Sequence, residues 1–334
     1  MMRMTLKDIA ERVGVSPATV SLALNNKPGV SEQTRQVIMD LAQQSGYSKK
    51  FNKKSIMFIK YIGDGAAVEH NGDFVARIID AIEETASRMG YALVIKNIQS
   101  GELEREIRAL CFDEVVGTIL MATEVEDIQG TLLESIPVPL VAVDNMFETN
   151  DIDSVVMDNY GGIYSAVEHL YKLGHREIGY IDSTIRFSNF DQRRKGFYRA
   201  LEKFDLKVDE KYMYYIQANL QGAYCDMQES LKENRMLPTA FVAANDTVAI
   251  GAIKALKEKG IDIPNQISFV GFDDIPFCRV LEKNLTTMNV DKEQLGEEAV
   301  KLLDRKITNE TRGSIKILTR TKLMVRESTQ VLQR

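Results

Sequence analysis

TLKDIAERVGVSPATVSLAL, residues 5–24, decides the fold of the first part of the chain. Thr5 stands before an apolar-periodic run and Asp8 follows three residues later, a capping-box variant that begins a helix. The apolar face of this helix is formed by Leu6, Ile9, Ala10 and Val13. Gly14 then supplies the permissive backbone that ends a helix.

A second helix is predicted directly after the turn at Gly14, because Ser16 is a favourable N-cap and Pro17 fits the first helical position. A third helix is predicted from its cap at Ser31 to Gly46. We expect the core between these helices to contain Ala10, Val15, Val20, Val37, Ile38, Leu41 and Ala42. The outward face of the second helix is expected to carry Pro17, Ala18, Ser21 and Leu22. Two short helices around a tight turn are a helix-turn-helix arrangement.

Charge is distributed unevenly along the 334 residues, whose formal net charge is −6. Residues 1–54 hold nine Lys and Arg against four Asp and Glu, a net charge of +5. The remaining residues hold 33 basic and 44 acidic side chains, a net charge of −11. A basic head on an acidic body indicates a polyanion-binding module joined to a part that avoids nucleic acid.

The composition, 44% hydrophobic and 27% charged, is that of a globular protein and excludes a disordered or collagen-like chain. No run approaches the ~18 apolar residues of a membrane span, and the first eight residues lack the apolar core of a signal peptide. We therefore expect a cytoplasmic protein with no membrane partner. Cys111, Cys225 and Cys278 lie far apart among apolar neighbours, so we expect buried thiols rather than disulfides or metal ligands.

Beyond residue 55, short apolar runs alternate with helical patterns, which specifies parallel sheets with helices on both faces. The eight predicted strands are Ile56–Ile62, Tyr91–Ile95, Gly117–Met121, Leu140–Val143, Ile178–Ile181, Tyr212–Ile216, Ala240–Ala244 and Ser268–Phe272. They divide into two sheets, with the break predicted after Asp144. Gly90, Gly174 and Gly260 are expected to end helices just before the next strand.

A helix-turn-helix in a basic segment is typical of DNA binding, with its second helix in the major groove, although a three-helix bundle is also a common structural unit. The decisive motifs are TLKDIA at 5–10, VGVS at 13–16, ATVS at 18–21, Leu24-Asn25 and Gly46-Tyr47. They closely resemble the DNA-binding head of the lactose-repressor (LacI/GalR) family of bacterial transcription regulators, almost continuously over residues 5–47.

The resemblance implies roles for individual residues. It places Pro17, Ala18 and Leu22 at base edges. It places Ser16, Thr19, Ser21, Asn25 and Thr34 near phosphates, and Thr5 and Tyr47 also belong to the expected DNA-binding set. Leu22 departs from the family pattern, which usually has Arg at this position. Because Leu makes only apolar contacts, for instance with a thymine methyl group, we expect an operator that depends less on guanine at that step.

The connector also departs from the family. Its relatives have a hinge helix that inserts a leucine pair into the minor groove, whereas here a short basic linker, residues 49–55, leads directly into the first strand. The hinge helix is therefore truncated, and no residue matches the inserted leucine. The lysines of the linker suit either a path along the phosphate backbone or a solvated flexible segment.

The body resembles the sensor of the same family through VMDNYGG at 156–162, LGHR at 173–176, AND at 244–246, SFVGFDD at 268–274 and VREST at 325–329. The implied fold is a two-lobed periplasmic-binding-protein-like body of doubly wound parallel sheets, in which the chain crosses between lobes three times. The helix Asp291–Ile307 would return to the first lobe and the strand near Leu323 to the second. The expected domains are residues 1–48 for DNA binding and 56–330 for effector binding and dimerisation. Lobe 1 would comprise about 56–157 and 289–318, and lobe 2 about 158–288 and 319–330.

Ligands of such sheets lie at the carboxyl ends of the strands. The residues at these positions are Asp64, Asp144, Ser183, Asn245 and Asp273. The resemblance implies effector contacts for Arg193, Asn245 and Asp273, and places Asp144 near the ligand. Asp, Asn and Arg suit hydroxyl groups, so a small polar effector such as a sugar or sugar phosphate is expected.

For other residues near the cleft, both a ligand-binding role and a structural role stay open. Phe187 and Phe190 could stack on the apolar face of a sugar or belong to the core. For Asp158, Asn159 and Asp274 we favour helix capping and turn geometry over ligand binding.

These patterns predict a ligand-responsive transcription regulator. It would repress carbohydrate-utilisation genes and bind a palindromic DNA operator as a homodimer. No HExxH, P-loop or GxSxG motif is present, so we expect no enzyme, no cofactor and no metal. The alternative is a cytoplasmic sugar-binding protein in which DNA binding is weakened or lost.

Overall fold

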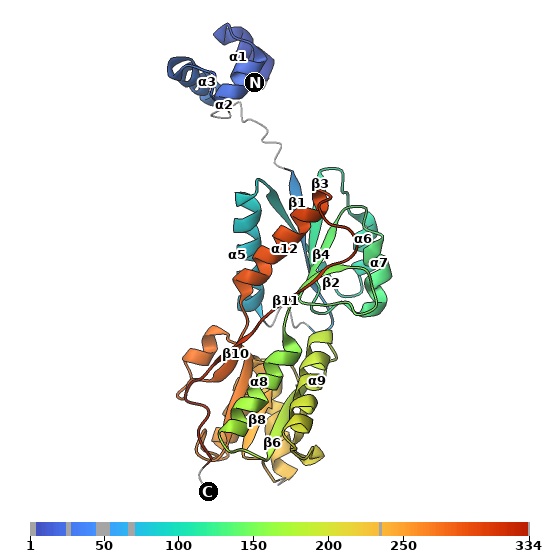
Figure 1. The fold of residues 1–334 in the computed structure, drawn as a ribbon, viewed down its shortest axis with the longest axis vertical. Helices are drawn as coiled ribbons and strands as arrows, with labels where there is room; N and C mark the ends of the chain where they lie inside the picture. Colours follow the sequence, from blue (N-terminus) through green and yellow to red (C-terminus); the bar gives the residue numbers. More distant parts are fainter. Residues whose placement is uncertain (1–4, 25–27, 45–53, 66–70, 234–235, 333–334) are drawn as a thin grey trace. The chain divides into compact units, whose positions relative to one another are not determined.

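The computed structural model describes residues 5–24, 28–44, 54–65, 71–233 and 236–332. The chain forms two compact units that divide between Lys53 and Lys54. The first unit contains α1 (Leu6–Val13), α2 (Pro17–Leu24) and α3 (Glu32–Gln44), as Figure 1 shows. Its core consists of Ile9, Ala10, Val20, Ala23, Ile38 and Ala42.

The helix signals of the first unit are confirmed. The Thr5 amide donates to the Asp8 carboxylate at 2.6 Å, and the Asp8 amide donates to the Thr5 hydroxyl at 3.3 Å, which completes the capping box of α1. Gly14 follows with φ of 71°. The Ser16 hydroxyl accepts the Thr19 amide at 3.1 Å, so Ser16 caps α2 as predicted.

At the third helix, the prediction that Val37 faces inward is wrong, because its side chain is 50% exposed. Val37 therefore lies outside the face of α3 that carries the buried residues Ile38 and Ala42. The cap at Ser31 is confirmed, since its hydroxyl accepts the Thr34 amide at 3.2 Å. The predicted end at Gly46 lies outside the described residues.

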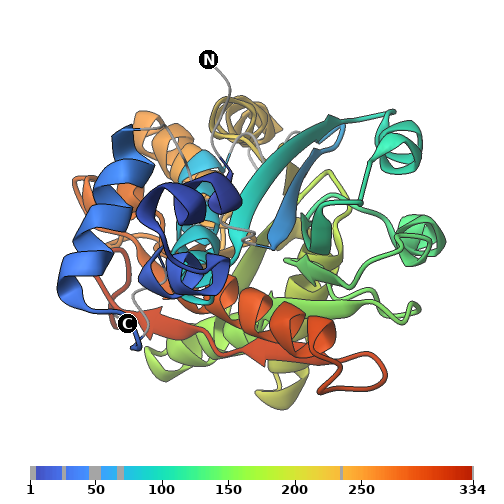
Figure 2. The same cartoon turned by 90° about the horizontal axis from the view of Figure 1, so that it is seen from above.

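The second unit contains two six-stranded sheets. The first has the order β11-β5-β4-β3-β1-β2 with all neighbours parallel. Its strands are β1 (Ser55–Ile62), β2 (Ala92–Gln99), β3 (Val115–Met121), β4 (Leu140–Val143), β5 (Asp153–Met157) and β11 (Lys316–Thr319). Its helices are α5 (Gly72–Arg88) and α12 (Lys292–Ile307) on one face, and α6 (Leu103–Ala109) and α7 (Gly130–Glu134) on the other, as Figure 2 shows.

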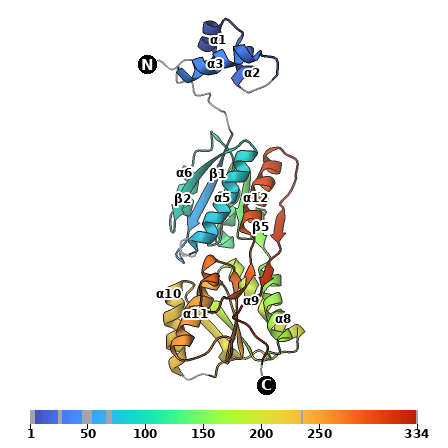
Figure 3. The ribbon, with the colours of Figure 1, turned by 90° about the vertical axis from the view of Figure 1, so that its left-hand side faces the viewer.

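The second sheet has the order β12-β10-β9-β8-β6-β7 and is parallel except for the antiparallel pair β10 and β12. Its strands are β6 (Ile178–Ser183), β7 (Met213–Ile216), β8 (Ala240–Ala243), β9 (Ser268–Asp273), β10 (Thr286–Asn289) and β12 (Lys322–Met324). Its helices α8 (Asn159–Lys172) and α9 (Ser188–Lys203) lie opposite α10 (Leu220–Ser230) and α11 (Asp246–Glu258), as Figure 3 shows. Short 3-10 turns lie at Asp127–Gln129, Glu210–Tyr212, Leu231–Glu233 and Pro276–Arg279.

The chain crosses between the two lobes three times: after β5, after β10 and between β11 and β12. All eight predicted strands are present. These eight divide between the two sheets as predicted, four in each, but the first sheet continues past Asp144 because β5 also belongs to it. The apolar-run criterion missed β5, β10 and β11 because polar residues such as Ser154 and Thr286 occupy these strands and are nevertheless buried.

Two further expectations have definite outcomes. Cys278 is buried as expected, whereas Cys111 and Cys225 are exposed, so the prediction of buried thiols is wrong for these two. Apolar neighbours in the sequence did not indicate burial here, because Ala109, two residues before Cys111, is itself exposed. Among the described residues, none of the helices is long and apolar enough to cross a membrane.

Candidate functional site

The first unit presents the side chains predicted to approach DNA. Pro17 and Ala18 are exposed at the start of α2, while Ser21 and Leu22 are half-buried one turn later. The residues that cap helices form local hydrogen bonds: Thr5 bonds Asp8, Ser16 bonds Thr19 at 2.9 Å, and Thr34 bonds Ser31 at 2.7 Å. Asn25 and Tyr47 lie outside the described residues, as do linker residues 49–53.

In the second unit, the carboxyl ends of both sheets face one cleft, where Asp144 follows β4 with φ of 69°. This backbone conformation is rare for a non-glycine residue and is held here by side-chain contacts. The Asp144 carboxylate accepts the Thr123 hydroxyl at 2.6 Å and the Asn189 amide at 2.7 Å. Burial raises the pKa of Asp144 to about 6, although the hydrogen bond from Thr123 and the charge of Arg193 oppose this shift.

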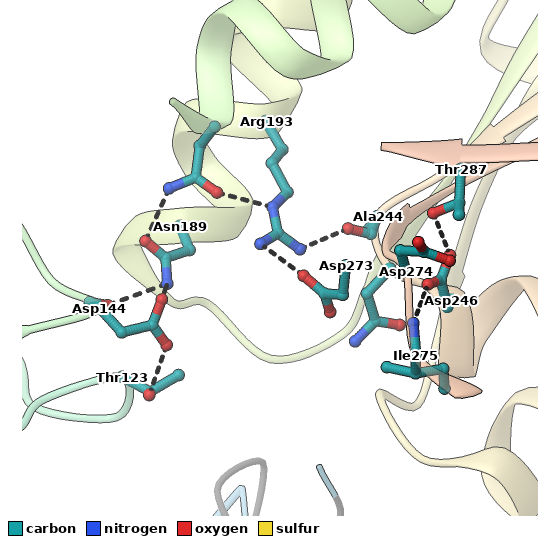
Figure 4. A network of polar contacts seen from close by, with 12 residues as sticks. Thr123, Asp144, Asn189, Arg193, Ala244, Asp246, Asp273, Asp274, Ile275 and Thr287 are labelled. Carbon is teal, nitrogen blue, oxygen red and sulfur yellow. Dashed lines mark hydrogen bonds and ion pairs between the residues drawn. The ribbon is translucent and has the colours of Figure 1, made fainter. Parts of the chain in front are cut away.

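Asn189 and Arg193 project from the same side of α9 and continue the network into the second lobe (Figure 4). Asn189 donates to the carbonyl and the carboxylate of Asp144 and accepts the amide of Asn159 at 2.8 Å. Arg193 donates through Nε to Asn159 at 2.8 Å and through Nη1 to the Ala244 carbonyl at 2.7 Å. One continuous chain of polar contacts therefore joins the ends of β4 and β8.

Arg193 is only 3% exposed and completes this chain at Asp273, with 3.3 Å between Nη2 and the carboxylate. The guanidinium lies 3.8 Å from the centroid of the Phe272 ring, a cation–π contact. Burial raises the pKa of Asp273, and the charges of Arg193 and Lys292 oppose this shift. The Asp273 backbone has φ of 110° and its carbonyl accepts from Lys292, the first residue of α12.

Asp246 lies behind Asp273 and is fully buried at the start of α11. Its carboxylate accepts the Thr287 hydroxyl at 2.6 Å and the Ile275 amide at 3.0 Å, as Figure 4 shows. Burial, together with the nearby charge of Asp273, raises the pKa of Asp246 to about 7. A Cβ on Gly271 would lie 2.1 Å from this carboxylate, so glycine is required there.

The other predicted cleft residues have more local roles. Asn245 caps α11 by accepting the Val248 amide at 2.9 Å. Asp64 accepts the hydroxyl of Ser100. The Ser183 hydroxyl accepts the Ile185 amide at 3.0 Å, which shapes the loop after β6.

Two cavities lie between the lobes. The inner one is about 40 Å³ and is bordered by Asp144, Arg193, Asn245, Asp273 and both predicted phenylalanines. The outer one is about 470 Å³ and is bordered by Asp64, Phe187, Lys195 and several acidic side chains of the first lobe. Phe187 thus borders both cavities, and its ring centroid lies 5.7 Å from that of Phe190.

Helix capping, the role favoured over ligand binding, is confirmed for Asp158, whereas Asp274 and Asn159 form other structural contacts. Asp158 caps α8 by accepting the Gly161 amide at 2.8 Å. Asp274 pairs with Arg326 at 2.6 Å and with Arg279 at 3.2 Å, and these partners lower its pKa although burial acts to raise it. Asn159 does more than begin a helix, because it joins Arg193 to Asn189.

Sequence reasoning missed Asn189, Thr123 and Lys292. The signal for Asn189 was its position four residues before Arg193, a spacing that puts both side chains on one helix face. No comparable signal marks Thr123 or Lys292. Within the described ranges, no group of three or more His, Cys, Asp or Glu side chains is arranged to hold a metal ion.

The helix-turn-helix head and the two-lobed body with a polar cleft define a DNA-binding regulator with a ligand-binding domain. A profile described as "Bacterial regulatory proteins, lacI family" matches residues 5–50, and one described as "Periplasmic binding protein-like domain" matches residues 167–329. The chain is 31% identical over 330 residues to the HTH-type transcriptional repressor PurR of Mannheimia succiniciproducens, covering 97% of this chain and 98% of that protein. The chain belongs to the lacI family and is a transcriptional repressor rather than an enzyme.

Other relatives agree over nearly the whole length. The chain is 30% identical to the probable HTH-type transcriptional repressor ExuR of Bacillus subtilis, covering 98% of this chain and 99% of that protein. The solved complex of the transcriptional regulator CelR with cellobiose is 27% identical, with a TM-score of 0.75 and coverage of 98% and 100%. The lac repressor dimer bound to operator and the anti-inducer ONPF shares the fold, with a TM-score of 0.83 at 24% identity and the same coverage.

Proposed function

We propose that this protein represses carbohydrate-utilisation genes in the cytoplasm by binding a palindromic operator as a homodimer, and that a sugar or sugar phosphate in the interlobe cleft controls that binding. In this proposal residues 1–48 bind DNA and residues 49–55 form a short linker. Residues 56–330 bind the effector and dimerise, divided into the two lobes at the bounds given above.

The observation that carries the effector proposal is the chain of contacts from Asp144 through Asn189, Asn159 and Arg193 to Asp273. Its members are the donors and acceptors that sugar hydroxyls use, since Asp accepts, Arg donates and Asn does both. A hydroxylated ligand could exchange these internal bonds for its own while keeping each buried group paired. The cellobiose complex of the 27% identical regulator CelR supports the same ligand class.

The dimer proposal rests on apolar side chains that this fold leaves uncovered. Val94 and Ile95 are exposed on the edge strand β2, and Leu220, Phe277 and Val280 are exposed around α10 and the turn after β9. Figure 3 shows β2, α10 and α11 on the same side of the two lobes. Exposed apolar clusters of this kind mark protein interfaces, and a second copy fits because the operator is expected to have two half-sites.

A thermal-shift screen of the full chain against sugars, sugar phosphates and purines tests the effector proposal. A ligand at one hundred times its Kd stabilises the folded state by about 2.7 kcal/mol, which raises Tm. We expect one carbohydrate to raise Tm, and Arg193→Ala to abolish the rise. Arg199→Ala is the matched control, because Arg199 lies on the exposed side of the same helix and pairs with Glu202.

Two outcomes would contradict the effector proposal. Purines alone could raise Tm, or the carbohydrate response could survive in Arg193→Ala while the folded variant keeps a cooperative transition. A carbohydrate response in a chain that selects no DNA sequence would instead favour the sugar-binding alternative.

A further inference from the structure

The outward face of α2 contains no side chain able to form two hydrogen bonds to one base. The helix reads PATVSLAL over Pro17–Leu24, with no charged or amide side chain. Pro17 and Ala18 are exposed, and Ser21 and Leu22 follow on the same side one turn later. This face therefore offers three apolar side chains and one hydroxyl.

Leu22 is not used by the core of the head. That core is formed by Ile9, Ala10, Val20, Ala23, Ile38 and Ala42, with Leu6, Val13, Val15, Leu24, Val30 and Leu41 packed against it. Among the described residues of the head, Leu22 belongs to neither group, and it is half-buried beside Gly29. A leucine that the core does not require is available to contact a partner.

Arg35, which contacts α2, does not supply the missing hydrogen bonds on this face. Arg35 of α3 is largely buried and donates through Nη1 to the carbonyl of Ala23 at 3.0 Å, so it is directed at the end of α2. Its contact stabilises the C-terminal turn of α2, where backbone carbonyls lack partners within the helix.

The chemistry of the major groove then limits what α2 can read. Guanine is recognised by Arg or Lys at O6 and N7, and adenine by Asn or Gln at N6 and N7, whereas apolar side chains recognise only the thymine methyl group. We propose that α2 reads the operator through thymine methyl groups packed on Pro17, Ala18 and Leu22, with no bidentate contact from this helix to guanine O6 and N7. This inference rests on the proposed function, in which α2 enters the major groove.

The experiment begins by selecting operators from a random duplex library with the full chain. Each thymine of the selected half-site is then replaced by deoxyuridine, which removes only the methyl group. We expect about fourfold weaker binding for each methyl that contacts α2, the value of one buried carbon. 7-Deazaguanine lacks only the N7 acceptor of guanine. Replacing guanine by it under α2 should leave the affinity unchanged, because α2 has no Arg or Lys to bond N7.

Variants assign the methyl contacts to α2. In Leu22→Ala, replacing one particular thymine by deoxyuridine should no longer weaken binding. In Leu22→Met, which keeps a large apolar side chain, the same replacement should still weaken binding. Val37→Ala is the matched control, since it removes an exposed apolar side chain from α3 and should preserve every methyl effect. Circular dichroism of each variant establishes that the head remains helical.

The outcomes separate this inference from the proposed function. If the library yields no enriched sequence, the proposed DNA-binding function fails. If it yields a sequence whose binding ignores deoxyuridine but weakens with 7-deazaguanine under α2, methyl readout is overturned and the DNA-binding function stands.

Discussion

Asn189 donates its side-chain amide to both the carbonyl and the carboxylate of Asp144, at 2.9 and 2.7 Å. The two residues belong to different lobes, since Asp144 ends β4 of the first sheet and Asn189 lies on α9 beside the second. The protein thus supplies its own contact across the cleft. An effector that binds between the lobes has to replace this contact or reinforce it, so the pair links occupancy of the cleft to lobe closure.

Asn189→Ala should destabilise the protein and weaken closure of the lobes. The substitution removes both donors to Asp144 and leaves a buried carboxylate with fewer partners, which costs about 1–3 kcal/mol. Urea unfolding measures the loss, and small-angle X-ray scattering should show a larger radius of gyration. Asn265→Ala is the matched control, because it removes an exposed amide that bonds Asp262 within one loop. Equal effects of the two variants would rule out a special role for the contact across the cleft.

The buried carboxyl group of Asp144 should make stability fall as pH rises from about 4 to 6. Its pKa is raised to about 6 from an ordinary value of 3.8, so the folded state holds a proton that the unfolded state releases. The stabilisation is complete below pH 3.8 and is lost as pH passes 6, with a total of about 3 kcal/mol. Unfolding free energies at pH 4.5 and 7.5 should therefore differ less in Asp144→Asn than in the unmodified protein.

Glu282→Gln is the control for this pH effect. The exposed carboxylate of Glu282 has its pKa lowered by Lys257, so its contribution is present at higher pH and is lost as pH falls. This variant should keep the decline between pH 4 and 6. The same decline in Asp144→Asn would show that another group, such as Asp246, is its source.

The local elements could be predicted from the sequence, but the contacts of the cleft could not. Thr5 with Asp8, and Ser16 with Pro17, are capping signals read within four residues, and both begin helices as expected. The strands with continuous apolar runs could also be predicted from the sequence. Strand β10 could not be predicted in this way, because Thr286 and Thr287 are polar yet fully buried. Their hydrogen-bond partners, Ser328 for Thr286 and Asp246 for Thr287, come from distant segments.

The same distinction applies to the site. The position of Asp144 at a strand end was predictable, since the rule for parallel sheets depends only on strand direction. Its partner Asn189 is 45 residues away, and the pairing requires the two lobes to meet. The resemblance suggested Arg193 and Asp273, but the internal hydrogen bonds that already satisfy them follow only from the packed structure.

Gly196→Ala should disturb the cleft from a distance. A Cβ at this position would lie 2.4 Å from the Tyr160 carbonyl oxygen, so α9 would have to move away from α8. This movement displaces Asn189 and Arg193 from Asn159, and overpacking of this kind costs about 1–3 kcal/mol. Thermal unfolding should show a lower Tm, and effector affinity should fall.

Gly72→Ala is the matched glycine control. A Cβ there meets no atom within 4 Å, and Gly72 is the first residue of α5. Alanine should be neutral or stabilise the helix by up to about 1 kcal/mol. A loss of effector binding in Gly72→Ala as large as in Gly196→Ala would argue against the packing explanation.

Phe277→Glu should prevent self-association if the apolar surface around α10 and β2 joins two copies. Phe277 is 62% exposed and borders an apolar cavity of about 280 Å³ with Leu220 and Ile250. A carboxylate at the centre of a desolvated contact has no partner and opposes association. Sedimentation equilibrium should give a dimer for the unmodified protein and a monomer for the variant. Ile128→Glu, at an 83% exposed side chain in the turn before α7, should remain dimeric, because this turn is not part of the proposed apolar surface.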